Sequence, residues 1–141
     1  MQSSDVTHML KSAGLRATKP RVRVLSILEE STIPLSVVDI TSLLKRPSVD
    51  QVTVYRTLES FVQAGLVNHV ELHQGRSFFE LATREHHHHL VCRSCGKVED
   101  VEDCVMDTLQ KKIEKKSKHF STVSSHALEF FGDCKECVLT K

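Results

Sequence analysis

Two pairs of cysteines stand out in this 141-residue chain as residues able to do chemistry. Cys92 and Cys95 form one pair, Cys134 and Cys137 form the other, and each pair encloses two residues. This spacing lets two thiolates reach one tetrahedral ion about 2.3 Å from each sulfur. The 38 residues 96–133 leave room for a small domain that the ion would clip at both ends. We predict a four-cysteine structural Zn2+ site, with a redox role for the pairs as the alternative.

Four consecutive histidines precede the first cysteine pair. Side chains alternate along a strand, so His86 and His88 would point one way and His87 and His89 the other. One strand could therefore serve two different metal sites, each with further ligands from elsewhere. Candidates for these further ligands are the acidic and imidazole side chains of Glu80, Asp107 and His126. The alternative is a solvated polar strand that binds no metal.

Basic residues gather near the start of the chain, although the formal net charge is only +1. Between Val6 and Leu28 the charged residues are all basic, namely Lys11, Arg16, Lys19, Arg21 and Arg23. Such a cluster can neutralise phosphates even when the whole molecule is nearly neutral. We expect Arg16, Lys19 and Arg21 to face phosphates or a minor groove. A solvated helix face is the alternative.

Helices followed by a hairpin are the pattern of the first 82 residues. We expect four helices. The first ends at Gly14 and the second begins after Thr18. The third begins at a capping box of Ser36 and Asp39, and the fourth at a second capping box of Ser48 and Gln51. The fourth helix would end near Gly65 and bury Val54, Leu58, Phe61 and Val62. Strands over 66–72 and 77–82 follow. This order predicts a winged helix-turn-helix.

In this chain the fourth helix would be the recognition helix of such a fold. Thr53, Tyr55 and Arg56 lie near its front. Arginine can read guanine bidentately, and threonine and tyrosine suit thymine methyl groups. For Tyr55 the alternative is packing against the wing.

The second part of the chain predicts a small α/β domain. We expect the histidine-rich strand, a turn, a strand over 97–101, a helix over 104–116 and a final strand near 122–131. Cys104 is expected to be a small buried helix residue, with a reactive or ligating thiol as the alternative. The fold class is therefore α+β: a winged helix-turn-helix domain over 1–83 and a zinc-clipped domain over 84–141.

With these residues in view, the chain resembles the ferric uptake regulator family of bacterial metal-sensing repressors. The resemblance covers nearly the whole length and rests on residues 14–21 (GLRATKPR), 52–58 (VTVYRTL), 78–80 (FFE), 86–96 (HHHHLVCRSCG) and 126–134 (HALEFFGDC). It implies a metal-dependent repressor that binds a palindromic double-stranded DNA operator as a homodimer, with a tetramer as the alternative. The second domain would then be the dimerisation domain.

The resemblance also implies roles for the candidate ligands. Cys92, Cys95, Cys134 and Cys137 match the family's structural zinc ligands. Glu80, His87 and His89 match its inter-domain sensing site. His86, His88, Asp107 and His126 match a further site inside the dimerisation domain.

One departure concerns the sensing site. The family usually supplies a histidine from the loop before the third helix, but residues 31–36 read STIPLS and hold none. We expect His69, His73 or water to complete the ligand sphere, and favour His69 on the strand entering the wing; the alternative is a weakened site.

The candidate ligands of the sensing site suit more than one metal. Imidazoles with one or two carboxylates suit Fe2+ and Zn2+ alike, and the family also includes manganese and peroxide sensors. A zinc hydrolase is a different class, but no helical HExxH motif is present to support it. A purely structural zinc adaptor is the third class. No apolar run approaches the ~20 residues of a membrane span, and no signal peptide is apparent, so we expect the cytoplasm.

Overall fold

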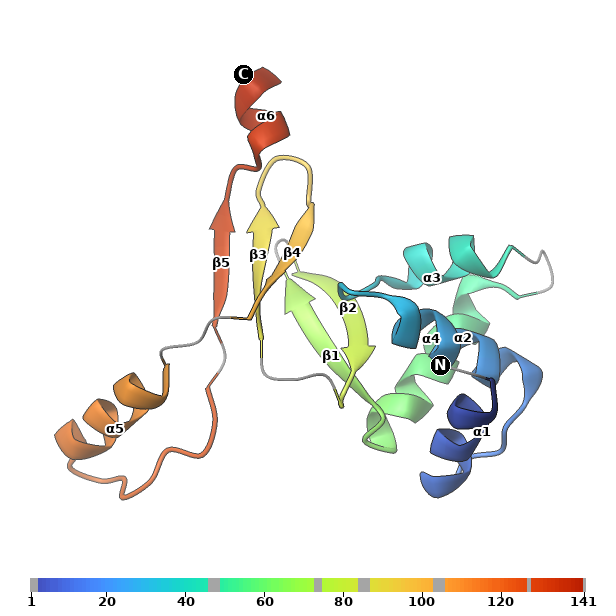
Figure 1. The fold of residues 1–141 in the computed structure, drawn as a ribbon, viewed down its shortest axis with the longest axis horizontal. Helices are drawn as coiled ribbons and strands as arrows, with labels where there is room; N and C mark the ends of the chain where they lie inside the picture. Colours follow the sequence, from blue (N-terminus) through green and yellow to red (C-terminus); the bar gives the residue numbers. More distant parts are fainter. Residues whose placement is uncertain are drawn as a thin grey trace. The chain divides into compact units, whose positions relative to one another are not determined.

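The computed structural model describes residues 3–45, 49–72, 75–83, 87–102, 106–126 and 128–140. By their internal contacts they form two compact units, Met1–Arg84 and Glu85–Lys141. The first unit holds α1 (Ser3–Ser12), α2 (Lys19–Glu30), α3 (Val37–Leu44), α4 (Gln51–Gln63), β1 (Val67–Leu72) and β2 (Arg76–Leu81) (Figure 1). The second holds β3 (His88–Cys92), β4 (Val98–Val101), α5 (Met106–Lys116), β5 (Glu129–Gly132) and α6 (Lys135–Thr140). Among the described helices, none combines the length and apolar character needed to cross a membrane.

Side-chain caps begin α3 and α4. The predicted capping box of α3 is confirmed: the Asp39 N–H donates to Ser36 Oγ (3.1 Å), and the Ser36 N–H donates to Asp39 Oδ2 (2.9 Å). At α4 the cap is Asp50, whose Oδ1 accepts from the Thr53 N–H over 2.8 Å. Our choice of Ser48, which lies outside the described residues, was wrong because the cap must directly precede the first helical residue.

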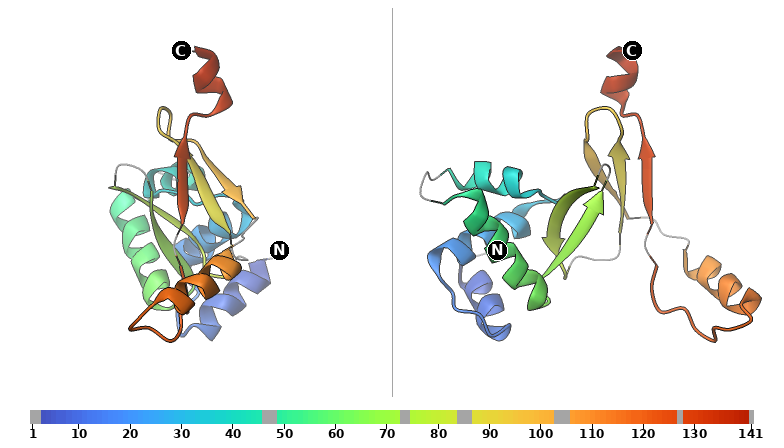
Figure 2. Two further views of the ribbon diagram at one scale, coloured as in Figure 1. Left: turned by 90° about the vertical axis from the view of Figure 1, so that its left-hand side faces the viewer. Right: turned by 180° about the vertical axis from the view of Figure 1, so that it is seen from behind.

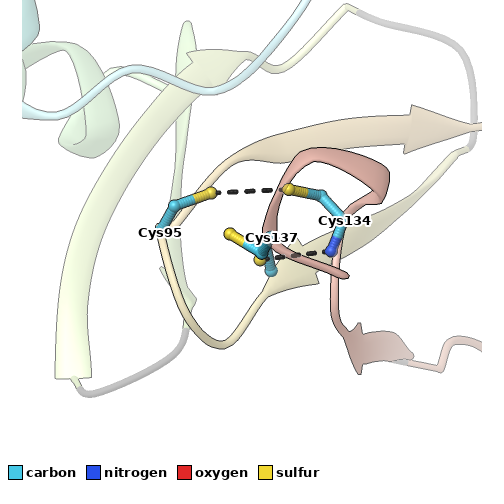
Figure 3. A group of neighbouring side chains, drawn as sticks. Cys95, Cys134 and Cys137 are labelled. Atoms are coloured by element: carbon cyan, nitrogen blue, oxygen red, sulfur yellow. Dashed lines mark hydrogen bonds between the residues drawn. The ribbon is translucent and has the colours of Figure 1, made fainter. Parts of the chain in front are cut away.

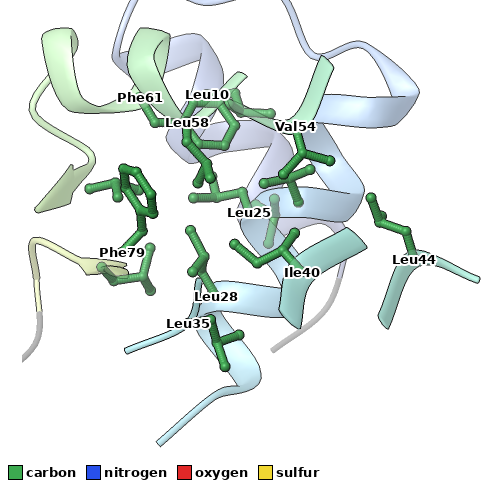
Figure 4. Packing of buried hydrophobic residues seen from close by; sticks show 14 residues of the cluster. Leu10, Leu25, Leu28, Leu35, Ile40, Leu44, Val54, Leu58, Phe61 and Phe79 are labelled. Carbon is green, nitrogen blue, oxygen red and sulfur yellow. The ribbon is translucent and has the colours of Figure 1, made fainter. Parts of the chain in front are cut away.

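The first unit has a continuous hydrophobic core, part of which Figure 4 shows. Val54, Leu58 and Phe61 of α4 are buried in it as predicted, whereas Val62 is 36% exposed. The segment before α3 joins the core through Leu35, whose backbone exchanges hydrogen bonds of 2.9 and 2.8 Å with that of Phe79. The buried cluster comprises Val6, Leu10, Val24, Leu25, Leu28, Leu35, Ile40, Leu44, Val54, Leu58, Phe61, Val67, Phe79 and Leu81.

Strands β1 and β2 form the antiparallel hairpin expected after the fourth helix. Its register pairs His69 with Phe79 and Asn68 with Glu80. Gly75 precedes β2 with φ of +69°, a left-handed conformation that favours glycine. Helices followed by this hairpin make the first unit a winged helix-turn-helix, which confirms the predicted fold class.

The second unit is built on a three-stranded sheet of order β4-β3-β5. β3 pairs antiparallel with β4 and parallel with β5. Within this unit, α6 and the β3–β4 turn lie at one end of the sheet and α5 at the other (Figures 1 and 2). The sheet therefore holds two groups of residues apart, one at each end.

Two predictions for the second unit were inaccurate. The final strand covers only Glu129–Gly132, and the short helix α6 was not foreseen. Residues 117–126 stay out of the sheet because α5 holds their backbone: Glu114 Oε1 accepts from the Val123 N–H over 2.7 Å.

The second unit has little hydrophobic core of its own. Among its described residues, Val91 and Cys92 are the only buried apolar side chains. Leu109 and Ile113 of α5 are 43% and 47% exposed. This unit therefore needs another source of stability.

Candidate metal centres and nucleic-acid interface

The four predicted cysteines meet at one end of the second unit's sheet. Cys92 ends β3, Cys95 lies in the following turn, Cys134 directly precedes α6 and Cys137 lies within it. Parallel pairing sets Cys92 opposite Gly132, two residues before Cys134. All four Sγ atoms lie within 4.8 Å of one another. Figure 3 shows how Cys95, in the turn after β3, faces Cys134 and Cys137 at α6.

The geometry of this four-cysteine cluster fits a zinc ion. Tetrahedral coordination at about 2.3 Å per sulfur separates the sulfurs by about 3.8 Å. Cys95 Sγ and Cys134 Sγ are 3.7 Å apart. Gly96 adopts φ of +77°, and its N–H donates to the Cys92 carbonyl over 2.9 Å, which closes the tight turn.

The cysteines differ in acidity. The Cys134 backbone N–H donates to Cys92 Sγ over 3.3 Å, and this bond is the main cause that lowers the pKa of Cys92 to about 6. Hydrogen bonding with Cys134, then with Cys95, raises the pKa of Cys137 to about 12. The thiolate is the form that binds metal. Cys92 is therefore already in its metal-binding form at neutral pH, whereas Cys137 must release a proton when an ion binds.

The histidine run sends its side chains in two directions. The rings of His87 and His89 lie 5.0 Å apart, edge to face. His88 instead approaches His126, with ring centroids 5.3 Å apart. The predicted alternation therefore holds for the three histidines that are described, while His86 and Cys104 lie outside the described residues.

His89 lies between two carboxylates that the sequence analysis missed. Its Nε2 is 3.9 Å from Asp100 Oδ1 and its Nδ1 is 4.0 Å from Glu129 Oε1. The sheet register causes this, because Asp100 on β4 and Glu129 on β5 both pair with His89 on β3. Only the strand pairing could have revealed them.

His126 makes a polar contact with α5. Its Nδ1 lies 2.7 Å from Gln110 Oε1, and Gln110 was also missed. The exposed Asp107 lies three residues earlier, so it shares one face of the helix with Gln110. The second unit thus gathers His88, His126 and this face of α5 at the end of the sheet away from the cysteines.

Glu80 and His69 occupy opposite faces of the hairpin. His69 stacks on Phe79, its partner in register, with ring centroids 5.2 Å apart. Neighbouring residues on a strand point to opposite faces, so Glu80 does not share the face of His69. The hairpin therefore does not bring His69 together with Glu80, as we had expected for a shared site. His73, the other candidate, lies outside the described residues.

The residues predicted to contact DNA are accessible on the first unit. Arg16 and Lys19 are exposed, and Arg21 is half-buried, with its Nη1 donating to the Arg16 carbonyl over 3.2 Å. Thr53, Tyr55 and Arg56 are exposed on α4. The Tyr55 ring borders a hollow of about 210 Å³ beside His69 and Phe79, yet it remains 47% exposed. All six side chains can therefore reach a ligand.

Comparison with known proteins decides the family. The model of the ferric uptake regulator family matches residues 12–131. The chain belongs to the ferric uptake regulator family. The ferric uptake regulation protein of Legionella pneumophila is 41% identical over 136 residues, which cover 94% of this chain and 98% of the relative. That of Escherichia coli (strain K12) is 35% identical, with 94% and 90% covered.

Solved structures of the ferric uptake regulator family share the fold. The regulator of Vibrio cholerae matches with a TM-score of 0.79 and 35% identity, over 91% of this chain and 98% of the other. That of Helicobacter pylori, described as having three functional metal binding sites, matches with a TM-score of 0.82 and 28% identity, over 98% and 95%.

Membership of the ferric uptake regulator family defines the general function. The chain is a metal-dependent transcriptional repressor and not an enzyme. Regulators of this family bind DNA operators and are dimers.

Proposed function

We propose that the chain uses Zn2+ in the four-cysteine site to hold its second unit together, and a separate, exchangeable ion to control operator binding. In this proposal residues 1–83 read DNA and residues 84–141 bind metal and dimerise. The observation that carries the structural role is the cysteine cluster, whose 3.7 Å sulfur separation suits zinc. A unit with so little buried apolar surface would depend on such an ion.

The regulatory ion would be bound by Glu80 of the first unit together with His87 and His89 of the second. Asp100 supports this assignment as a further oxygen ligand, because it lies beside His89 Nε2. It would replace the histidine that the family supplies before the third helix. His69 has no place in this set, for the reason given above.

An ion that takes ligands from both units would restrict how they move relative to each other. In a homodimer, the distance between the two recognition helices must match the half-site spacing of a palindromic operator. The ion would therefore favour the DNA-binding conformation through its higher affinity for that conformation. Arg16, Lys19 and Arg21 would contact the backbone or minor groove, and Thr53, Tyr55 and Arg56 the bases.

We propose Fe2+ or Zn2+ as the sensed ion, with Mn2+ as the third candidate. Imidazole suits both of the first two metals, and the carboxylates of Glu80 and Asp100 add oxygen ligands that iron and manganese accept. Relatives support this range: the Francisella tularensis regulator was solved with iron (31% identity, TM-score 0.77) and the Pseudomonas aeruginosa regulator with manganese (31% identity, TM-score 0.71). As a DNA-binding regulator the protein would act in the cytoplasm.

A third ion would bind inside the dimerisation domain. His88 and His126 would be its imidazole ligands and Asp107 its carboxylate, together with His86 from the sequence assignment. The 5.3 Å approach of the His88 and His126 rings supports this site. Such an ion would join β3 to α5.

Replacing the proposed carboxylate ligand tests the regulatory site. Glu80→Ala should weaken metal-dependent operator binding by at least about tenfold, the scale at which metal sites respond to lost partners, while leaving the four-cysteine zinc in place. Operator titrations at fixed salt, with and without added Fe2+, measure this. Glu71→Ala, an exposed glutamate on the neighbouring strand, is the matched control. An unchanged metal response in Glu80→Ala would refute the regulatory site.

A further inference from the structure

One face of α5 carries polar side chains that bind the chain segment following the helix. Gln110 and Glu114 lie on this face, four residues apart. Glu114 Oε1 accepts from the Val123 N–H over 2.7 Å, and Gln110 Nε2 donates to the Val123 carbonyl over 3.4 Å. These bonds hold Val123, and with it the segment that leads to His126, against the helix.

The Gln110 amide has one consistent orientation. Its NH2 group can only donate and its oxygen can only accept. Because the NH2 group faces the Val123 carbonyl, the oxygen faces His126, 2.7 Å from Nδ1. The neutral His126 ring must therefore carry its proton on Nδ1, which leaves on Nε2 the lone pair that a metal ion requires.

His88 adopts the same Nδ1–H tautomer, but its hydrogen-bond partner is a backbone carbonyl. Its Nδ1 lies 3.2 Å from the Leu128 carbonyl, which can only accept, so this ring also donates from Nδ1. The backbone thus orients His88, whereas a side chain orients His126. Only the second arrangement can be changed by substitution.

We propose that Gln110 is a positioning residue that sets the tautomer and ring orientation of His126 in the dimerisation-domain metal site. The inference rests on the proposed function in taking His126 as a ligand. A metal-bound histidine is commonly held by a hydrogen bond from its second ring nitrogen, and loss of such a partner typically weakens metal binding by about 10- to 100-fold. Through Gln110, occupancy of this site would also depend on α5 being formed.

The test compares variants of α5 in the full-length dimer that retains its cysteine-bound zinc. Gln110→Leu removes the acceptor at similar size, Gln110→Glu keeps an acceptor, and Lys111→Leu places the same apolar residue on the next, exposed position. Long-range 1H–15N NMR reports the His126 tautomer without labile metal. Co2+ titration followed by absorption reports affinity and the number of labile ions.

We expect His126 to be the Nδ1–H tautomer in the wild type, Gln110→Glu and Lys111→Leu. Gln110→Leu should show mixed tautomers and bind Co2+ about 10- to 100-fold more weakly. His88 should keep its tautomer in every variant. An unchanged His126 tautomer and an unchanged Co2+ affinity in Gln110→Leu would overturn the positioning role. If Gln110→Leu does not fold, Gln110→Glu decides: a shift of His126 to the Nε2–H tautomer in that variant would overturn the positioning role as well.

His126→Ala separates this inference from the proposed site itself. Loss of one labile Co2+ per chain in His126→Ala supports the metal site. If Gln110→Leu then leaves the His126 tautomer and the Co2+ affinity unchanged, only the positioning role of Gln110 is refuted. Retention of every labile Co2+ in His126→Ala would instead refute the site.

Discussion

At the scale of single residues, protonation decides how readily the cysteines accept an ion. Cys92, with a pKa of about 6, is a thiolate at neutral pH, and Cys137, with a pKa of about 12, is not. Metal binding must therefore displace a proton from Cys137 at neutral pH, and one from Cys92 as well below pH 6.

This difference predicts the pH dependence of zinc affinity. Protons released on binding set the slope, so affinity should fall as pH falls and should fall more steeply below about pH 6. Competition with a chromophoric chelator between pH 5 and 8, corrected for the chelator's own protonation, measures it. Cys92→Ser should lose the steeper part of the curve. A constant slope through pH 6 in the wild type would contradict the assignment to Cys92.

At the scale of elements, the start of the recognition helix depends on Asp50. Hydrogen bonds from Thr53, first from its side chain and then from its backbone N–H, lower the pKa of this carboxyl. A depressed pKa means that the charged cap stabilises the fold above the unfolded value of 3.8, and that this contribution is lost as pH falls through the lower folded value. At neutral pH the cap is fully formed.

Replacing Asp50 should therefore loosen the first turn of α4, which holds Thr53 and directly precedes Tyr55. Asp50→Ala should lower the thermal midpoint of the first unit and weaken operator binding several-fold at pH 7. Asp50→Asn is the matched control, because asparagine caps equally well while removing the same charge. Thermal unfolding and operator titration at fixed salt measure both effects. If the two variants behaved alike, charge and not capping would be the cause.

Local patterns predicted the elements that local interactions define. The capping box at Ser36 and the apolar side of α4 follow from sequence spacing alone. The four-cysteine group could be predicted too, because each cysteine pair is set by local spacing and a single long-range contact between the two pairs completes the site. Residues 117–126 escaped prediction because their structure depends on Gln110 and Glu114 of another element.

The positions of several candidate metal ligands likewise depend on contacts between elements. His69 lies on the face of the hairpin opposite Glu80 because the register pairs it with Phe79, which the pattern of a single strand does not reveal. Asp100 and Glu129 were missed because each meets His89 only through pairing between strands. Distances between strands are thus the part of the site that spacing along the chain does not encode.

At the scale of the whole molecule, the two units draw stability from different sources. The first has a continuous apolar core, whereas the second has few buried apolar side chains and a four-cysteine site. Structural zinc supplies on the order of 10 kcal/mol to the folding of small zinc domains. The second unit should therefore depend on its ion far more than the first.

Removal of the cysteine-bound zinc tests this division. We expect amides of β3, β4 and β5 to exchange faster than in the zinc-bound protein, while those of α2 and α4 keep their protection. Hydrogen exchange before and after treatment with a strong chelator under reducing conditions gives the measurement. A mild chelator that removes only the labile ions is the control. Protection that persisted throughout the second unit would show that zinc is not its main support.

The central claim is that a labile ion, bound by Glu80, His87 and His89, makes operator binding dependent on metal. The most direct measurement is anaerobic titration of a palindromic operator by the wild-type dimer, with zinc retained in the cysteine site and labile ions either removed or restored as Fe2+. At one fixed salt concentration the loaded dimer should bind about 5- to 150-fold more tightly, the usual range of coupling between two sites. Equal affinity and equal selectivity of the stripped and loaded dimers would contradict the account.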